Sequence, residues 1–81
     1  MAGIRTDQVW YNPGDVATAR AVNVEPPYKI RCVVDGIIID ESENLPLHVN
    51  IDGEWEGGIV HFYLIKDGET VAQTHAHVNS D

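Results

Sequence analysis

Cysteine is almost missing from this chain of 81 residues, which contains only Cys32. A disulfide within the chain is therefore excluded. Cys32 lies in the mostly apolar segment 30–34, so we expect a small buried side chain rather than a reactive thiol. Apolar runs of the roughly 18 residues that a membrane span needs are also missing. The first residues lack the basic and apolar regions of a signal peptide, so we expect a cytoplasmic or virion-associated protein.

Basic residues are scarce in this sequence. Five Lys and Arg stand against thirteen Asp and Glu, which gives a formal net charge of −8. A surface with this charge repels phosphate backbones, so we do not expect direct binding to nucleic acid. The acidic charge either serves solubility alone or complements a basic surface on a protein partner.

Sequence patterns typical of enzymes are missing as well. Ser42 and Ser80 lie in polar segments without a nucleophile-elbow motif. Gly57 and Gly58 precede an expected strand rather than the helix of a phosphate-binding loop. The acidic segments 40–43 and 52–56 lack the ligand spacing of a calcium-binding EF-hand. We therefore expect a protein that is not an enzyme.

Turn residues divide the sequence into short segments rich in β-branched and aromatic residues. Strong turn signals occur at 12–15, 25–27, 35–36 and 52–58. The segments between them predict strands at residues 8–11, 16–24, 28–34, 37–40, 47–51, 59–65 and 70–78. For segment 16–24 the alanines also permit a helix capped by Asp15, but Thr18, Val22 and Val24 favour a strand.

Six or seven short strands without helices between them predict an all-β fold. The fold we expect is a small antiparallel β-sandwich, and the alternative is a small β-barrel. The length allows one domain over residues 1–81, in which residues 1–6 and 79–81 are expected to be loosely held. A parallel sheet is not expected, because the helices of βαβ units are missing.

Residues 59–78 predict a β-hairpin around the turn at 66–69. One parity of each strand is apolar and expected to face the core: Val60, Phe62 and Leu64, with Ala72, Thr74, Ala76 and Val78 opposite. The other parity faces outward and carries His61, Tyr63, Gln73, His75 and His77. Paired residues of two strands point to the same face, so both apolar sets face the core only if the numbers of paired residues sum to an even value. A two-residue loop at 67–68 would give an odd sum. We therefore expect an odd loop with Gly68 in a left-handed G1 bulge.

Two segments resemble compact immunoglobulin-like β-sandwich modules of bacterial and viral proteins. Tyr11-Asn12-Pro13-Gly14-Asp15 looks like their opening turn, and residues 62–71, FYLIKDGETV, look like their closing hairpin. The chain departs from the antibody pattern, because a lone Cys32 cannot form an inter-sheet disulfide and no tryptophan lies in the central strand. The resemblance implies a module used for adhesion, assembly or partner binding, and it carries over no functional residue.

Three histidines are the main chemical candidates. His75 and His77 are two apart on one expected strand and point the same way, and His61 lies on the same face of the neighbouring strand. Three imidazoles could hold Zn²⁺ or an iron ion at about 2.0–2.1 Å, with an acidic or water ligand completing the site. The same pattern is also expected of polar residues on the wet face of a hairpin.

Partner binding is the function that the remaining sequence favours. The candidate contact residues are Trp55 with its neighbours Glu54 and Glu56, and Tyr63. Trp55 either covers the end of the core or stands exposed as an anchor between carboxylates. The leading hypothesis is a non-enzymatic protein–protein interaction or assembly module, including self-association. The alternatives are a small acidic inhibitor of phage or plasmid type, which blocks a basic nucleic-acid-binding groove on a partner protein, and a metal-binding domain using the histidines.

Overall fold

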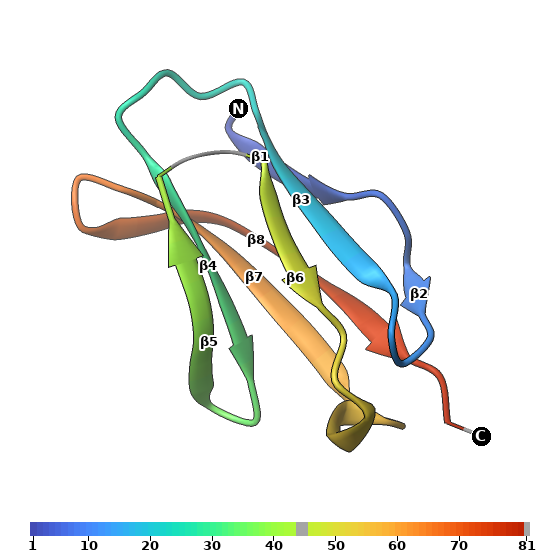
Figure 1. The fold of residues 1–81 in the computed structure, drawn as a ribbon. Helices are drawn as coiled ribbons and strands as arrows, with labels where there is room; N and C mark the ends of the chain where they lie inside the picture. Colours follow the sequence, from blue (N-terminus) through green and yellow to red (C-terminus); the bar gives the residue numbers. More distant parts are fainter. Residues whose placement is uncertain (44–45, 81) are drawn as a thin grey trace.

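The chain forms two β-sheets that pack against each other, and the computed structural model describes residues 1–43 and 46–80 (Figure 1). In chain order the elements of this part are β1 (Gly3–Thr6), β2 (Trp10–Tyr11), β3 (Val16–Val22), β4 (Lys29–Val34), β5 (Ile37–Ser42), β6 (Leu47–Asn50), the 3-10 turn η1 (Gly53–Trp55), β7 (Ile59–Lys66) and β8 (Glu69–Val78). No helix in these residues is long and apolar enough to cross a membrane.

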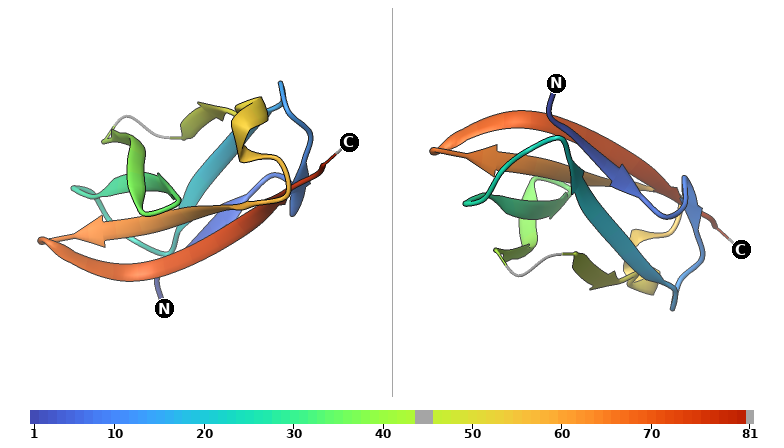
Figure 2. Two further views of the ribbon diagram at one scale, coloured as in Figure 1. Left: turned by 90° about the horizontal axis from the view of Figure 1, so that it is seen from below. Right: turned by 90° about the horizontal axis from the view of Figure 1, so that it is seen from above.

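One sheet has the strand order β1-β3-β6 and the other has the order β2-β8-β7-β4-β5. The long hairpin of β7 and β8 runs the length of one layer (Figure 2). The prediction of a β-sandwich is therefore confirmed, with eight strands in the described residues instead of six or seven. The barrel alternative is wrong, because the two sheets stay separate and each ends in edge strands.

Alternate residues of the strands fill the space between the sheets. Val60, Phe62 and Leu64 of β7 are buried there, as predicted, and so are Ala76 and Val78 of β8. From β4 the core receives Ile30, Cys32 and Val34, each at most 3% exposed. Burial, with a smaller contribution from the Asp40 carboxylate, raises the pKa of Cys32 to about 12. The thiol therefore stays protonated and packs as a small apolar group.

Segment 16–22 is a strand, as favoured, and its alanines face the core. Ala17 pairs with Val49 and Ala19 pairs with Leu47 across β3 and β6. Both alanines are fully buried, whereas Val16 is 48% exposed. The β-branched residues of β3 thus point outward and its small residues inward.

Both end segments of the described residues pair with other strands. Residues 3–6 were expected to be loose, but they form β1, which pairs antiparallel with β3 from Gly3↔Val22 to Thr6↔Ala19. Ile4 is 8% exposed and belongs to the core. At the other end, the Asn79 N–H donates to the Tyr11 carbonyl oxygen at 2.8 Å. Asp81, the last residue expected to be loose, lies outside the described residues.

Strand β2 pairs in parallel with β8, through Trp10↔His77 and Tyr11↔Val78. No parallel pair was predicted, because the sequence contains no βαβ unit. That argument applies to strands that follow each other in the chain. Since β2 and β8 lie at opposite ends of the sequence, they need no crossover helix.

The β7–β8 hairpin has the predicted even register from Ile59↔His77 to Leu64↔Ala72. The odd loop was wrong: Lys66 pairs with Glu69, so the loop contains only Asp67 and Gly68. The extra residue lies instead in β8, where Val71 is skipped between the pairs Leu64↔Ala72 and Ile65↔Thr70. Gly68 is left-handed, as expected, with φ 79°, and Asp67 has φ 53°. Two residues with positive φ are typical of a type I′ turn, which a two-residue hairpin loop prefers.

Candidate interaction surface

The outer face of the five-stranded sheet carries a row of neighbouring aromatic and imidazole rings, which we call the ring face: Trp10, His77, His75, His61 and Tyr63. Trp10 of β2 stacks on His77 of β8, with ring centroids 4.6 Å apart and planes 26° apart. His75 meets His77 edge to face at 5.4 Å, and His61 lies 6.2 Å from His75. His61 in turn lies 6.3 Å from Tyr63 on the same strand. The ring face thus crosses three adjacent strands.

Strand register places these rings together. His61 lies directly opposite His75, and Tyr63 lies opposite Gln73. Their neighbours of opposite parity, such as Phe62 and Ala76, are fully buried, so the rings must point to solvent. The sequence predicted this grouping for the three histidines and Tyr63. It missed Trp10, because only the long-range parallel pairing of β2 with β8 brings Trp10 beside His77.

The histidines are neighbours, but they do not form a metal site in their present arrangement. Residues 1–43 and 46–80 contain no group of three His, Cys, Asp or Glu side chains that could hold a metal ion. The ring of His77 is stacked on Trp10, and the planes of His61 and His75 differ by 47°. The three histidines proposed to bind zinc or iron, His61, His75 and His77, are therefore close together, but their rings are not arranged as metal ligands.

His48 is not part of the ring face. It lies on β6 of the other sheet, opposite Thr18, and its Nδ1 is 3.1 Å from the Thr18 hydroxyl. His48 faces outward, but it does so on the outer face of the three-stranded sheet, which is the side of the sandwich opposite the ring face. The fourth histidine therefore contributes nothing to the cluster of three.

Trp55 lies at the end of the sandwich, inside η1. The Asp52 side chain accepts a hydrogen bond from the Glu54 N–H at 2.9 Å and caps this turn. Trp55 is half-buried and packs against the core, while Glu54 and Glu56 are exposed. This arrangement agrees better with a tryptophan that covers the end of the core than with an exposed anchor. Tyr63 lies elsewhere, in the middle of β7, so the predicted partner-binding residues do not form one patch.

Strand β5 exposes three consecutive isoleucines, Ile37, Ile38 and Ile39, which we call the isoleucine edge. Their exposed fractions are 63%, 55% and 39%. β5 is the last strand of its sheet and has β4 as its neighbour on one side only (Figure 1). From the sequence we expected a short strand here, and an apolar run gives no sign that the strand is exposed.

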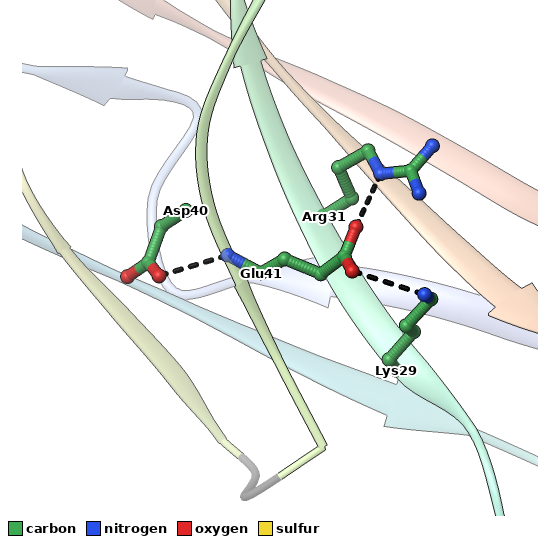
Figure 3. A network of polar contacts seen from close by, with 4 residues as sticks. All are labelled: Lys29, Arg31, Asp40 and Glu41. Carbon is green, nitrogen blue, oxygen red and sulfur yellow. Dashed lines mark hydrogen bonds and ion pairs between the residues drawn. The ribbon is translucent and has the colours of Figure 1, made fainter.

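Glu41 lies on β5 as well, rather than in the acidic loop that the sequence indicated. Its carboxylate binds Arg31 Nε at 2.5 Å and Lys29 Nζ at 3.0 Å, both from β4 (Figure 3). These two partners, Arg31 first, hold the pKa of Glu41 below its ordinary value. Because Arg31 and Glu41 are directly opposite in the sheet, the ion pair marks the register of β4 and β5. All three groups are about one-third exposed, so the pair contributes little to stability.

No protein-family model matches this chain, and no curated protein sequence shows significant similarity to it.

Proposed function

We propose that this protein is a non-enzymatic, immunoglobulin-like β-sandwich module that acts through protein–protein contact. The observation that carries the proposal is the ring face. It presents Trp10, which is 55% exposed, beside three imidazoles and the Tyr63 phenol on the outer face of the sheet. Trp and Tyr are the residue types most enriched at the centres of protein interfaces.

The distribution of charge supports the same proposal. The protein carries a formal net charge of −8, yet none of the five ring-face residues is acidic. On the neighbouring strands β4 and β5, Arg31 forms an ion pair with Glu41, so these two charges compensate each other. An interface core with few unpaired charges costs little to desolvate, and the acidic remainder of the surface favours solubility before a partner is met.

The strand order supports the immunoglobulin-like part of the proposal. In immunoglobulin-type sandwiches one sheet contains strands A, B, E and D, and the other contains G, F and C, to which a further strand C′ is added in variable-type domains. The order β1-β3-β6 corresponds in chain order to A, B and E, with no counterpart of D in the described residues, and the order β8-β7-β4-β5 corresponds to G, F, C and C′. β2 then corresponds to a first strand that has divided and crossed to the second sheet.

The test uses N-terminally tagged protein to capture partners from a lysate of the native host. The capture is done at low and at high salt, and the bound proteins are identified by mass spectrometry. The ring-face double variant Trp10→Ala/His75→Ala is compared with the wild type, and His48→Ala on the opposite sheet is the matched control. We expect a partner that the wild type and the control retain and the double variant loses, with far-UV circular dichroism unchanged. A partner retained equally by all three proteins would refute the ring face as the contact surface.

The acidic-inhibitor alternative gives a different pattern in this experiment. Its partner would be a basic protein recovered only at low salt, because charge mimicry is screened by ions. Its anchor would be Trp55, so Trp55→Ala would lose the partner while the ring-face variant kept it. That result would replace the module proposal by the inhibitor.

A further inference from the structure

The free side of β5 offers unpaired backbone groups. β5 is hydrogen-bonded to β4 alone and ends the order β2-β8-β7-β4-β5. An edge strand presents a row of N–H and C=O groups to which another extended chain can bind. Residues 37–41 of β5 make up this edge.

β5 is also apolar on both of its faces. Ile37 pairs with the buried Val34 and lies on the inner side of the sheet, whereas Ile38 pairs with Val33 and lies on the outer side. Ile39 is the extra residue of the bulge between them and Asp40. All three are nevertheless exposed, and no residue of β5 is buried. The three-stranded sheet is narrower than the five-stranded sheet, and it leaves the inner face of β5 uncovered at Ile37. A chain added here would gain apolar contacts above and below its backbone.

Carboxylates flank the isoleucine edge at both of its ends. Asp35 lies in the turn before β5, and Asp40 and Glu43 follow the isoleucines; all three are exposed. Within the described residues, both ion pairs of this region use Glu41. Asp35, Asp40 and Glu43 are therefore without a cationic partner in the part of the chain that the structure describes. The Asp40 carboxylate accepts the Glu41 N–H at 2.8 Å (Figure 3).

We propose that β5 binds an extended segment of a partner protein by strand addition, and that this segment has an apolar, β-branched centre with Lys or Arg at both ends. This inference rests on the proposed function and names the chemistry of the partner at one edge of the same sheet. The backbone groups supply the pairing, the isoleucines select the apolar centre, and the flanking carboxylates select the basic ends.

A second copy of this chain is a poorer occupant than a basic segment. In a two-fold antiparallel pairing centred on Ile38, the turn that carries Asp35 in each chain comes beside Asp40 and Glu41 of the other, so carboxylates of the two copies approach each other. Like charges directly opposite across strands are destabilising. Each copy also carries a net charge of −8.

The probe is a synthetic peptide with a Val-Ile-Val centre and two lysines at each end, titrated into ¹⁵N-labelled protein. The matched control is the same peptide with proline in place of the central isoleucine, because it keeps the charge but cannot pair as a strand. The protein variants are Ile38→Arg in β5 and Val16→Arg, which makes the same change at an exposed position of the other sheet.

We expect chemical-shift changes concentrated on β4 and β5, and new slowly exchanging amides in β5. Binding should weaken at least tenfold in Ile38→Arg and with the proline peptide, and it should stay within about twofold of wild type in Val16→Arg. In Asp35→Asn/Asp40→Asn the affinity and its salt dependence should both decrease.

Equal binding of the proline peptide, or shift changes spread over the acidic surface, would overturn the inference in favour of charge attraction alone. A wild-type dimer in sedimentation that becomes a monomer in Ile38→Arg would overturn it in favour of a second copy. No binding of the peptide would also overturn it. The ring-face capture experiment is independent of β5, so a partner lost only with Trp10→Ala/His75→Ala would preserve the proposed function while the strand-addition inference failed.

Discussion

Asp7 and Tyr11 show how one hydrogen-bonded pair fixes the start of the fold. The Tyr11 side chain is fully buried, and its hydroxyl donates to the Asp7 carboxylate and accepts from the Gln8 N–H at 3.3 Å. Asp7 also accepts the Thr18 N–H at 3.1 Å, which ties the β1–β2 connection to β3. Burial, followed by the bond to Asp7, raises the pKa of Tyr11 to about 12. Burial alone would raise the pKa of Asp7, but its hydrogen bonds from Tyr11 and Thr18 lower it overall.

The substitution Tyr11→Phe removes only the hydroxyl and should reduce the free energy of unfolding by about 1.5–3 kcal/mol at neutral pH, because a hydrogen bond to a charged group is lost. The raised pKa of Tyr11 favours its neutral form in the folded state. Its contribution is therefore fully present below pH 10.0, the ordinary value, and is lost as the pH rises toward about 12. Urea unfolding of both proteins from pH 7 to pH 11.5 measures this.

The difference between wild type and Tyr11→Phe isolates Tyr11, because Cys32 also has a raised pKa and titrates in both proteins. The two unfolding curves should converge as the pH approaches 12. A constant difference between them would show that the Tyr11 hydroxyl does not titrate with folding.

At the scale of the element, the β7–β8 hairpin shows how a turn and a register are chosen separately. The turn takes Asp67 and Gly68, both with positive φ, in the shortest loop that matches strand twist. The core needs an even register, and the skipped Val71 reconciles the two requirements within β8. A bulge inside a strand thus performs the task that we assigned to the loop.

The substitution Gly68→Ala should destabilise the protein by about 1–2 kcal/mol, because the added Cβ disfavours left-handed backbone. Gly68 has φ 79° and no atom within 4 Å of the position a Cβ would take, so the cost comes from conformation and not from a clash. Thermal unfolding measures the loss. Asp67→Asn is the control, since Asn tolerates φ 53° well, and it should leave the midpoint nearly unchanged. An equal loss in both variants would contradict the conformational explanation.

Local patterns explain which elements the sequence predicted. Alternation in 59–78 is long and regular, so it identified the buried Val60, Phe62, Leu64, Ala76 and Val78 and placed His61, His75 and His77 on one face. It did not identify the buried Ile65, and Ala72 and Thr74, which were expected to face the core, are only partly buried. β1 was missed, because Gly3-Ile4-Arg5-Thr6 contains a single large apolar residue and its pairing with β3 is long-range. The exposure of the isoleucine edge was not predicted, for a related reason. A run of apolar residues usually marks a buried strand, and only the width of the opposite sheet shows that β5 is uncovered.

The whole molecule is small and strongly acidic, and its charges repel one another in the folded state. A formal charge of −8 is carried on 81 residues with a radius of gyration of 12.1 Å. Repulsion between like charges destabilises a compact chain. The described ion pairs that oppose it meet at Glu41 and are partly exposed, so they offset little of the repulsion.

Added salt should therefore stabilise this protein. Between about 10 mM and 500 mM NaCl the screening length falls from roughly 30 Å to less than 10 Å, which is shorter than the molecule. We expect the unfolding midpoint to rise by several degrees, the shift that about 1 kcal/mol gives in a domain of this size. Calorimetry at a fixed pH of 7 measures the shift. A midpoint that falls with salt would mean that attractive ion pairs outweigh the net repulsion.

The parallel pairing of β2 with β8 has a mechanical consequence. Force applied in opposite directions to the chain before β2 and the chain after β8 acts along both strands. It must then break together the bonds from the His77 N–H to the Val9 carbonyl and from the Asn79 N–H to the Tyr11 carbonyl, each 2.8 Å long. An antiparallel pair pulled from one end opens one bond at a time. The ends of the chain lie at opposite ends of the sandwich (Figure 1), so a row of such modules under tension would load this pair in shear, the direction in which it is strongest.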